Sequence, residues 1–154
     1  MTDPLADWRI LGGMSDSVNH PSHYAHPSGV EAIDICEHLT FNLGNALKYL
    51  WRAGKKGPAA EDYRKAAWYL RREVAFQQRP GRRARYVVSR EAQEKAALAV
   101  AHTIDEWPLR CLLAAICNLN VTPEEFLRVA DDCDRGASEL EGARAARMRK
   151  EWGA

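Results

Sequence analysis

The pattern of apolar and polar positions predicts helices along most of the chain and no convincing pair of strands. The clearest element is a helical hairpin with one helix from about Leu43 to Lys55 and a second from about Ala60 to Gln77. A Gly57-Pro58 break separates the two helices. Each helix carries an apolar stripe at steps of three and four residues, formed by Leu43, Leu47, Leu50, Trp51, Tyr63, Ala67, Leu70 and Val74. We expect these two stripes to pack together.

Weaker signals predict further helices on both sides of the hairpin. Ser28 can cap a helix over about residues 29–39, and Ser89 can cap another that ends near Thr103. Trp107 begins a fifth helix. Thr122 followed by Pro123 is a strong start signal for a sixth, and a last helical stretch covers residues 137–150. The predicted fold is therefore all-α, with a three-helix N-terminal unit centred on the hairpin and a C-terminal helical bundle.

Composition along the chain suggests four segments. Residues 1–18 have no periodicity and predict a flexible arm, and residues 19–78 form the helical unit around the hairpin. Residues 79–88 have the composition of an arginine-rich linker and end in a short extended piece. Residues 89–154 form the C-terminal helical region. The pattern leaves open whether this region completes a single core or forms a second small bundle.

Length and composition are those of one domain with appendages. The chain has 154 residues, of which 46% are hydrophobic, enough for a proper core. No apolar run approaches the roughly 20 residues that cross a bilayer, and residues 1–17 lack the pattern of a signal peptide. We therefore expect a soluble intracellular protein without a membrane partner. The four cysteines form no C-x-x-C pair, and we expect buried thiols.

Charge is distributed unevenly although the net charge is only +1. Residues 41–90 hold thirteen lysines and arginines but three acidic residues, whereas both flanking segments are acidic. The middle of the chain can therefore meet an anion, such as a phosphate ligand, a nucleic acid or an acidic partner. A solvated surface followed by a basic linker explains the charge equally well.

Phosphate binding is the first candidate function of this basic region. Asn45, Lys48, Arg52 and Lys56 recur at steps of three and four residues and so share one helix face. An amide, an ammonium group and a guanidinium group spread over roughly 10 Å match the phosphates of a nucleotide. The alternative is an exposed cationic face with salt links to acids of the next helix.

Acidic and histidine residues give two further candidate sites. Glu31 and Asp34 are one helical turn apart and, with Asp62, could hold a Mg²⁺ ion, although helix capping and surface acids often produce this spacing. His20, His23 and His26, beside Tyr24, could contact phosphate, bind a transition metal or transfer protons; alternatively, the loop packs over the hairpin. No P-loop motif is present.

Four motifs together resemble a known family. They are N-H-P-x-H-Y at residues 19–24, G-x-E-x-I-D at 29–34, F-x-L-G-N-A-x-K-Y-L-x-R-A-G-K-K at 41–56 and D-x-x-K-A-x-W-Y-L at 62–70. The sequence from about residue 18 to 76 resembles a family of small phage-encoded domains, described as of unknown function or as nucleotide kinases. The resemblance implies phage origin, location in the host cytoplasm and phosphorylation of deoxynucleoside monophosphates by ATP without a P-loop.

Together, the residue patterns and the resemblance suggest a role for each candidate residue. Catalysis would involve His20, His23 and Arg52. Nucleotide and phosphate binding would involve Tyr24, Asn45, Lys48, Arg52, Lys55, Lys56, Lys65 and Tyr69. A Mg²⁺ ion would be held by Glu31, Asp34 and Asp62.

The sequence is also compatible with two other functions. One is a Mg²⁺-dependent all-α nucleotide pyrophosphatase, and the other is a non-enzymatic module that binds a nucleotide, a nucleic acid or a host protein. We also expect a homo-oligomer, because a hairpin this small leaves Trp51 and Trp68 with little to cover them within one chain.

Overall fold

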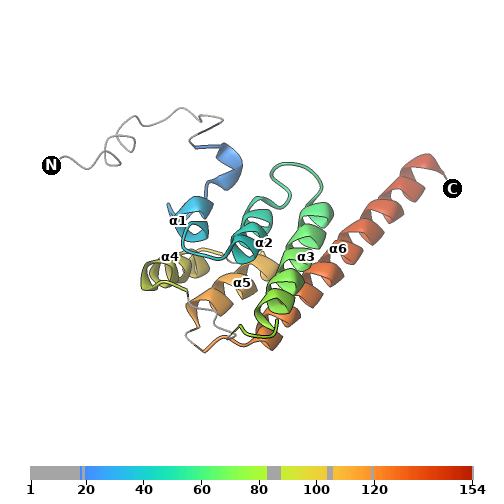
Figure 1. Ribbon diagram of the computed structural model, residues 1–154. Helices are drawn as coiled ribbons and strands as arrows, with labels where there is room; N and C mark the ends of the chain where they lie inside the picture. The colour runs from blue at the N-terminus through green and yellow to red at the C-terminus, as the bar shows by residue number, and fades with distance from the viewer. Residues whose placement is uncertain (1–17, 19, 83–87, 104–105, 119, 154) are drawn as a thin grey trace.

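The computed structural model describes residues 18, 20–82, 88–103, 106–118 and 120–153. These residues form six α helices and one 3₁₀ helix, and no strand occurs among them (Figure 1). The elements in chain order are η2 (Ser22–Tyr24), α1 (Ala32–Cys36), α2 (Phe41–Arg52), α3 (Ala59–Gln77), α4 (Arg90–Ala101), α5 (Trp107–Cys117) and α6 (Pro123–Trp152). The prediction of an all-α fold is confirmed.

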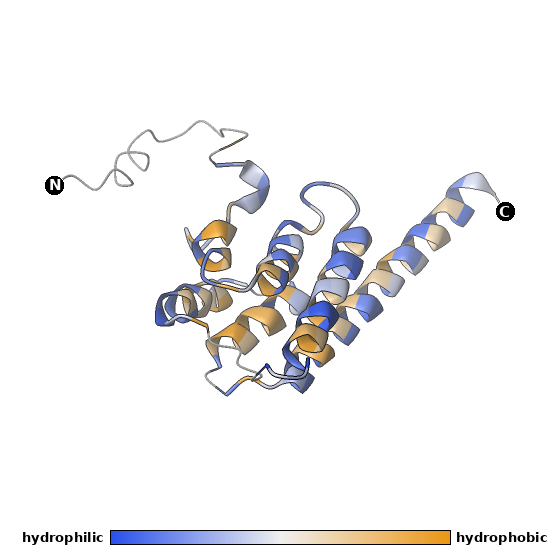
Figure 2. Cartoon of the chain, in the orientation of Figure 1, coloured by the Kyte–Doolittle hydropathy of each residue, from blue (hydrophilic) through white to orange (hydrophobic). Residues whose placement is uncertain are grey.

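The hairpin of α2 and α3 lies at the centre of the bundle. Helix α6 packs along α3, α5 packs on α2 and α4, and the short α1 contacts both α2 and α4 (Figure 1). The buried apolar residues of all these helices form one continuous cluster, and Figure 2 shows hydrophobic residues on the inward sides of the helices. The C-terminal helices therefore share a core with the hairpin, while the last turns of α6 extend beyond it.

Side-chain caps form at three helix starts, of which those at Ser89 and Thr122 were predicted from the sequence. Thr40, Ser89 and Thr122 each accept a hydrogen bond from a backbone N–H three residues later. In α6 this interaction is reciprocal, because the Glu125 carboxylate accepts from the Thr122 N–H at 2.8 Å. The predicted starts at Ser89, Trp107 and Thr122 are confirmed.

Two predicted helix ends near the hairpin were wrong. The first helix covers only Ala32–Cys36, because Gly29 adopts a positive φ of 75° and Glu31 takes the N-cap position that was predicted for Ser28. Helix α2 ends at Arg52 rather than Lys55, since the chain leaves helical geometry at Ala53. The lysines that follow Arg52 therefore lie in the turn between α2 and α3.

Helix α6 continues where two separate helical stretches were predicted. It is unbroken over 30 residues and passes through Gly136. A side chain at this glycine would place its Cβ 3.2 Å from Cε2 of the Tyr63 ring on α3. The small residue therefore permits the close approach of α3 and α6, and this packing stabilises a continuous helix through a weak point in the sequence.

Trp51 is covered within the single chain. Its side chain is fully buried, its indole N–H donates to the Tyr24 carbonyl at 2.8 Å, and its ring lies 4.8 Å from that of His26. The argument that Trp51 needs a partner chain was therefore wrong, whereas Trp68 remains 58% exposed. The loop before α1 supplies this cover.

Three of the predicted segments lie wholly or partly outside the described residues. Residues 1–17 of the predicted arm and 83–87 of the predicted linker lie outside the described residues, as does most of the predicted extended piece.

All four cysteines are free thiols; Cys133 is buried and the other three are partly buried. Among the helices described, none combines the length and apolar character needed to span a membrane.

Candidate functional site

Several predicted site residues gather around one residue that the sequence analysis had not singled out, Tyr49. The Lys48 ammonium lies 4.7 Å from the centroid of its ring, the Arg52 guanidinium 4.8 Å and the Lys65 ammonium 5.5 Å. The Tyr69 ring stacks against it with centroids 5.8 Å apart. Cations over an aromatic ring are attracted by its negative face. We call these five residues the Tyr49 cluster.

Arg52 is fixed within this cluster by an ion pair with Asp62. Its Nη2 lies 3.1 Å from Asp62 Oδ1, and the exposed fractions of the two side chains are only 17% and 5%. Burial opposes the charge on Arg52, but the hydrogen bond and the negative charge of Asp62 outweigh it, so the pKa of Arg52 is raised. Arg52 Nε and Asp62 Oδ2 are both buried without a hydrogen-bond partner among the described residues. The pair therefore has unused hydrogen-bonding capacity on both sides.

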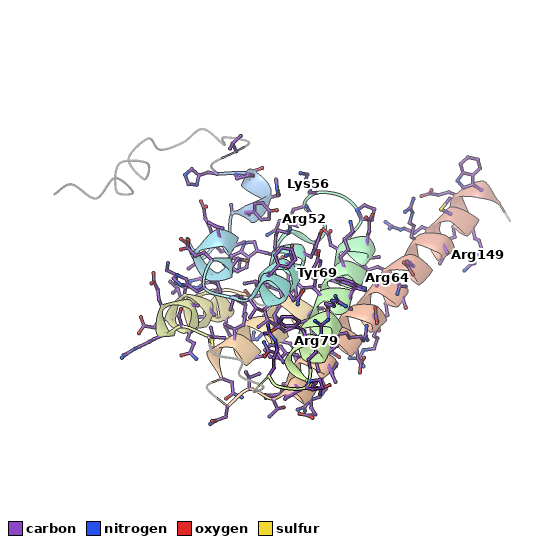
Figure 3. The ribbon with its side chains drawn as sticks, viewed as in Figure 1. Arg52, Lys56, Arg64, Tyr69, Arg79 and Arg149 are labelled. Carbon is purple, nitrogen blue, oxygen red and sulfur yellow. The ribbon has the colours of Figure 1, made fainter. Side chains whose placement is uncertain are left out.

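His23 lies beside the cations at the end of the hairpin. Burial lowers the pKa of its imidazole, and the positive charges of Lys56, Arg52 and Lys55 lower it further. At neutral pH the ring is therefore uncharged and one nitrogen can accept a hydrogen bond. Figure 3 shows Lys56 and Arg52 at the same end of the α2–α3 hairpin. The structure thus brings His23 and the predicted phosphate-binding cations into one region.

A groove of about 430 Å³ lies between α1, the 3₁₀ helix and the first half of α2. Ile33 and Phe41 contribute apolar surface to it, and Gly44 lies along its wall, where a Cβ atom would meet the Cys36 carbonyl at 3.3 Å. Its polar lining includes four predicted site residues, namely Tyr24, Glu31, Asn45 and Lys48. A mostly apolar hollow with a few polar groups is typical of small-molecule sites.

Lys48 belongs to both the groove and the Tyr49 cluster. Its side chain lines the groove, while its ammonium group lies over the Tyr49 ring. Asn45 holds this ammonium group at 2.8 Å through its Oδ1 atom, and the Asn45 amide nitrogen donates to the Phe41 carbonyl. The apolar groove therefore opens onto a cationic surface at Lys48.

The acidic residues predicted for Mg²⁺ are engaged elsewhere. Glu31 and Asp34 form a capping box at the start of α1, and Glu31 also lies 2.8 Å from His20 Nδ1. Asp34 is 3.9 Å from the Lys95 ammonium, and Asp62 is paired with Arg52. The described part of the chain contains no group of three histidine, cysteine or acidic residues placed to hold a metal. The structure therefore does not bring the three predicted ligands together.

The predicted histidine group is also divided among different contacts. His20 faces Glu31, and His23 lies near the hairpin lysines. His26 hydrogen-bonds with the hydroxyl groups of Ser28 and Thr103 and packs on Trp51. His26 therefore connects the loop to the C-terminal helices, in agreement with the packing alternative for this residue.

A family comparison covers the N-terminal part of the chain that holds the candidate site. Residues 18–71 match the family DUF3310, which is described as a protein of unknown function. The Gene 1.7 protein of Enterobacteria phage T3 is 42% identical over 66 residues. This similarity covers 36% of the present chain and 40% of the relative, and no solved structure matches the chain.

The matched segment contains every predicted site residue, from His20 to Tyr69. It also contains Tyr49, which lies within one of the four motifs but was assigned no role from the sequence. The similarity supports a phage-related small domain of unknown function. Helices α4, α5 and α6 lie outside the match.

Proposed function

We propose that the chain binds a nucleoside phosphate, with the base and sugar in the groove and the phosphate on the Tyr49 cluster. The observation that carries this proposal is the double position of Lys48, which lines the groove and lies over Tyr49. A volume of about 430 Å³ is within the range of small-molecule sites. The ligand would thus meet apolar surface at one end and positive charge at the other.

The cations of the cluster have the strength needed to hold such a ligand. A hydrogen bond to a charged group contributes about 1.5–3 kcal/mol when it is shielded from water. Three such bonds, from Lys48, Arg52 and Lys65, correspond to affinity in the micromolar range. Asn45 holds Lys48 and Asp62 holds Arg52 in place before any ligand arrives.

We further propose that the bound nucleotide is a deoxynucleoside monophosphate that accepts a phosphoryl group from ATP. Phosphoryl transfer depends mainly on positioning and on neutralising the negative charge of the transferring group. Arg52, Lys55 and Lys56 would provide that charge at the end of the hairpin. His23, uncharged at neutral pH and close to these cations, would orient the acceptor phosphate.

A Mg²⁺ ion held by the protein does not fit the residues described. Glu31 caps α1 and faces His20, and Asp34 completes the capping box, so their oxygens are already engaged. Asp62 neutralises Arg52. The proposed reaction therefore involves no protein-bound metal, and Mg²⁺ would enter as part of the ATP complex.

A transfer assay tests this proposal. Each deoxynucleoside monophosphate is incubated with ATP labelled on the γ-phosphate, with and without Mg²⁺, and the labelled nucleoside diphosphate is measured. We expect product with the unmodified chain, loss of product with Arg52→Ala, and unchanged product with Arg149→Ala, which removes an exposed charge near the end of α6. The assay also includes Arg52→Lys, because this variant keeps the charge but loses the planar guanidinium.

Other outcomes of the same assay would contradict phosphate transfer. Release of pyrophosphate from a nucleoside triphosphate without an acceptor would indicate the pyrophosphatase alternative. Tight nucleotide binding without any product would indicate a binding module. Circular dichroism of each variant distinguishes loss of activity from loss of folding.

A further inference from the structure

The free face of α3 carries cations and aromatic rings in alternation. Lys65, Tyr69, Arg72 and Phe76 follow one another at steps of four, three and four residues and therefore share one face. Arg79 and Arg82 continue the series, because their guanidinium groups lie 5.0 Å and 3.9 Å from the Phe76 ring. Trp68 lies at the edge of this face, with its ring 4.9 Å from that of Tyr69. We call these seven residues the α3 track.

The packing of α3 leaves this face partly uncovered, because Lys65, Tyr69 and Phe76 are half-buried while Trp68 and Arg72 are exposed. Residues on two other sides of α3, such as Leu70 and Tyr63, pack against the core and α6. In contrast, Trp68 is 58% exposed and Arg72 is exposed. Figure 3 shows Arg52, Tyr69 and Arg79 in succession along the α2–α3 hairpin. The track therefore extends from the Tyr49 cluster towards the far end of α3.

The arginines of the track have no acidic partners among the described residues, whereas Lys65 is paired with Glu61. Arg64 and Arg71, on the side towards α6, are paired with acidic residues of that helix. Arg72 has no acidic partner among the described residues, and the Glu73 next to it is completely buried. Trp68 and Arg72 line a hollow of about 390 Å³. An exposed indole beside an unpaired guanidinium group can contact a base and its phosphate at the same time.

We propose that the α3 track binds single-stranded nucleic acid. Single strands are held without sequence preference by cations that follow the backbone and aromatic rings that stack on bases, and the track provides both in alternation. From Lys65 to Phe76 it spans about 16 Å at 1.5 Å per residue, enough for about five stacked nucleotides at 3.4 Å each. This proposal does not require phosphate transfer. The track shares Lys65 and Tyr69 with the Tyr49 cluster, but Trp68 and Arg72, the residues tested below, lie outside the proposed nucleotide site.

The test is binding of a fluorescently labelled thymidine oligonucleotide to the full chain, followed by anisotropy. Trp68→Leu keeps the apolar surface but removes the stacking ring, and we expect at least about fivefold weaker binding. Arg72→Gln should weaken binding. It should also reduce the slope of log affinity against log salt concentration by about 0.7, the value for one phosphate contact on a single strand. If the three track arginines each neutralise a phosphate, affinity of the unmodified chain falls about 20-fold between about 50 and 200 mM salt.

Matched control variants are available at the far end of α6. Trp152→Leu and Arg149→Gln remove an exposed indole and an exposed guanidinium group from a surface outside the track, and both should bind as the unmodified chain does. Absence of binding at low salt would overturn the proposal. Equal loss in the α6 variants, or equal competition by heparin or anionic lipid vesicles, would also overturn it, because either result would mean attraction by charge alone.

Discussion

Arg52 and Asp62 join the last turn of α2 to the first turn of α3 through an ion pair of 3.1 Å that is almost completely shielded from water. The pair closes the hairpin at the end where Lys55 and Lys56 form the connecting turn. It also directs the Arg52 guanidinium towards the Tyr49 ring. The same contact therefore stabilises the fold and positions a residue of the proposed site.

Removing Asp62 is expected to destabilise the protein strongly. Asp62→Ala leaves the Arg52 charge in a shielded position without compensation, which typically costs about 3 kcal/mol or more. Urea denaturation measures the change in the free energy of unfolding. Glu141→Ala serves as the control, because its ion pair with Arg64 is exposed and should have little effect. Similar stability of the two variants would show that the buried pair is unimportant.

Local signals in the sequence predicted where helices occur but not how far each helix extends. Ser89 and Thr122 mark helix starts because a cap depends on a few neighbouring residues. The continuity of α6 depends instead on Gly136 meeting Tyr63, which is 73 positions away in the chain. Contacts between distant residues leave no periodic pattern, and this explains the incorrect break.

The candidate site was likewise predicted only where it depends on residues close together in the sequence. The helical spacing of Lys48 and Arg52 correctly indicated a shared face, and both lie over Tyr49. The groove, in contrast, exists because α1 packs beside α2, and the sequence does not specify that arrangement. Likewise, no pattern marks Glu73, which is fully buried and bonded by Asn42 and Gln77.

Two glycines of α6 should respond in opposite ways to substitution. Gly142 has open space around it, so Gly142→Ala is expected to stabilise the helix by up to about 1 kcal/mol through higher helix propensity. Gly136→Leu would press against the Tyr63 ring and is expected to cost about 1–3 kcal/mol. Thermal or urea unfolding measures both changes. Equal stability of the two variants would contradict close packing of α3 against α6.

Stability should decrease as pH falls below the ordinary histidine pKa. Burial lowers the pKa of His26 from 6.5, and the charges of Lys55 and His102 lower it further. The unfolded chain therefore binds a proton at His26 more strongly than the folded chain does. The stability that depends on an uncharged His26 is present above pH 6.5 and is lost as the pH falls towards the folded pKa. The free energy of unfolding is compared between about pH 7 and pH 5 for the unmodified chain and His26→Gln. We expect a smaller decrease in the variant, and an identical decrease would contradict this role of His26.

Thiol reactivity provides a separate check on the core. Burial raises the pKa of both Cys36 and Cys133 to about 12, and the Cys36 thiol also donates to the Gly44 carbonyl at 3.3 Å. The reactive thiolate is therefore scarce near neutral pH in the folded chain. Alkylation followed by mass spectrometry should show slow modification of both residues until the protein is unfolded. Rapid modification of Cys133 in the native protein would contradict its burial.

The most direct test of the central claim is calorimetric titration with deoxynucleoside monophosphates. If the groove and the Tyr49 cluster hold one ligand, the unmodified chain binds at least one of them in the micromolar range. Lys48→Met should weaken binding at least about tenfold by removing a charged hydrogen bond, and Ile33→Asp should weaken it by placing a carboxylate in the groove. Arg149→Ala should bind normally. No binding of any monophosphate, or unchanged affinity in Lys48→Met, would contradict the account.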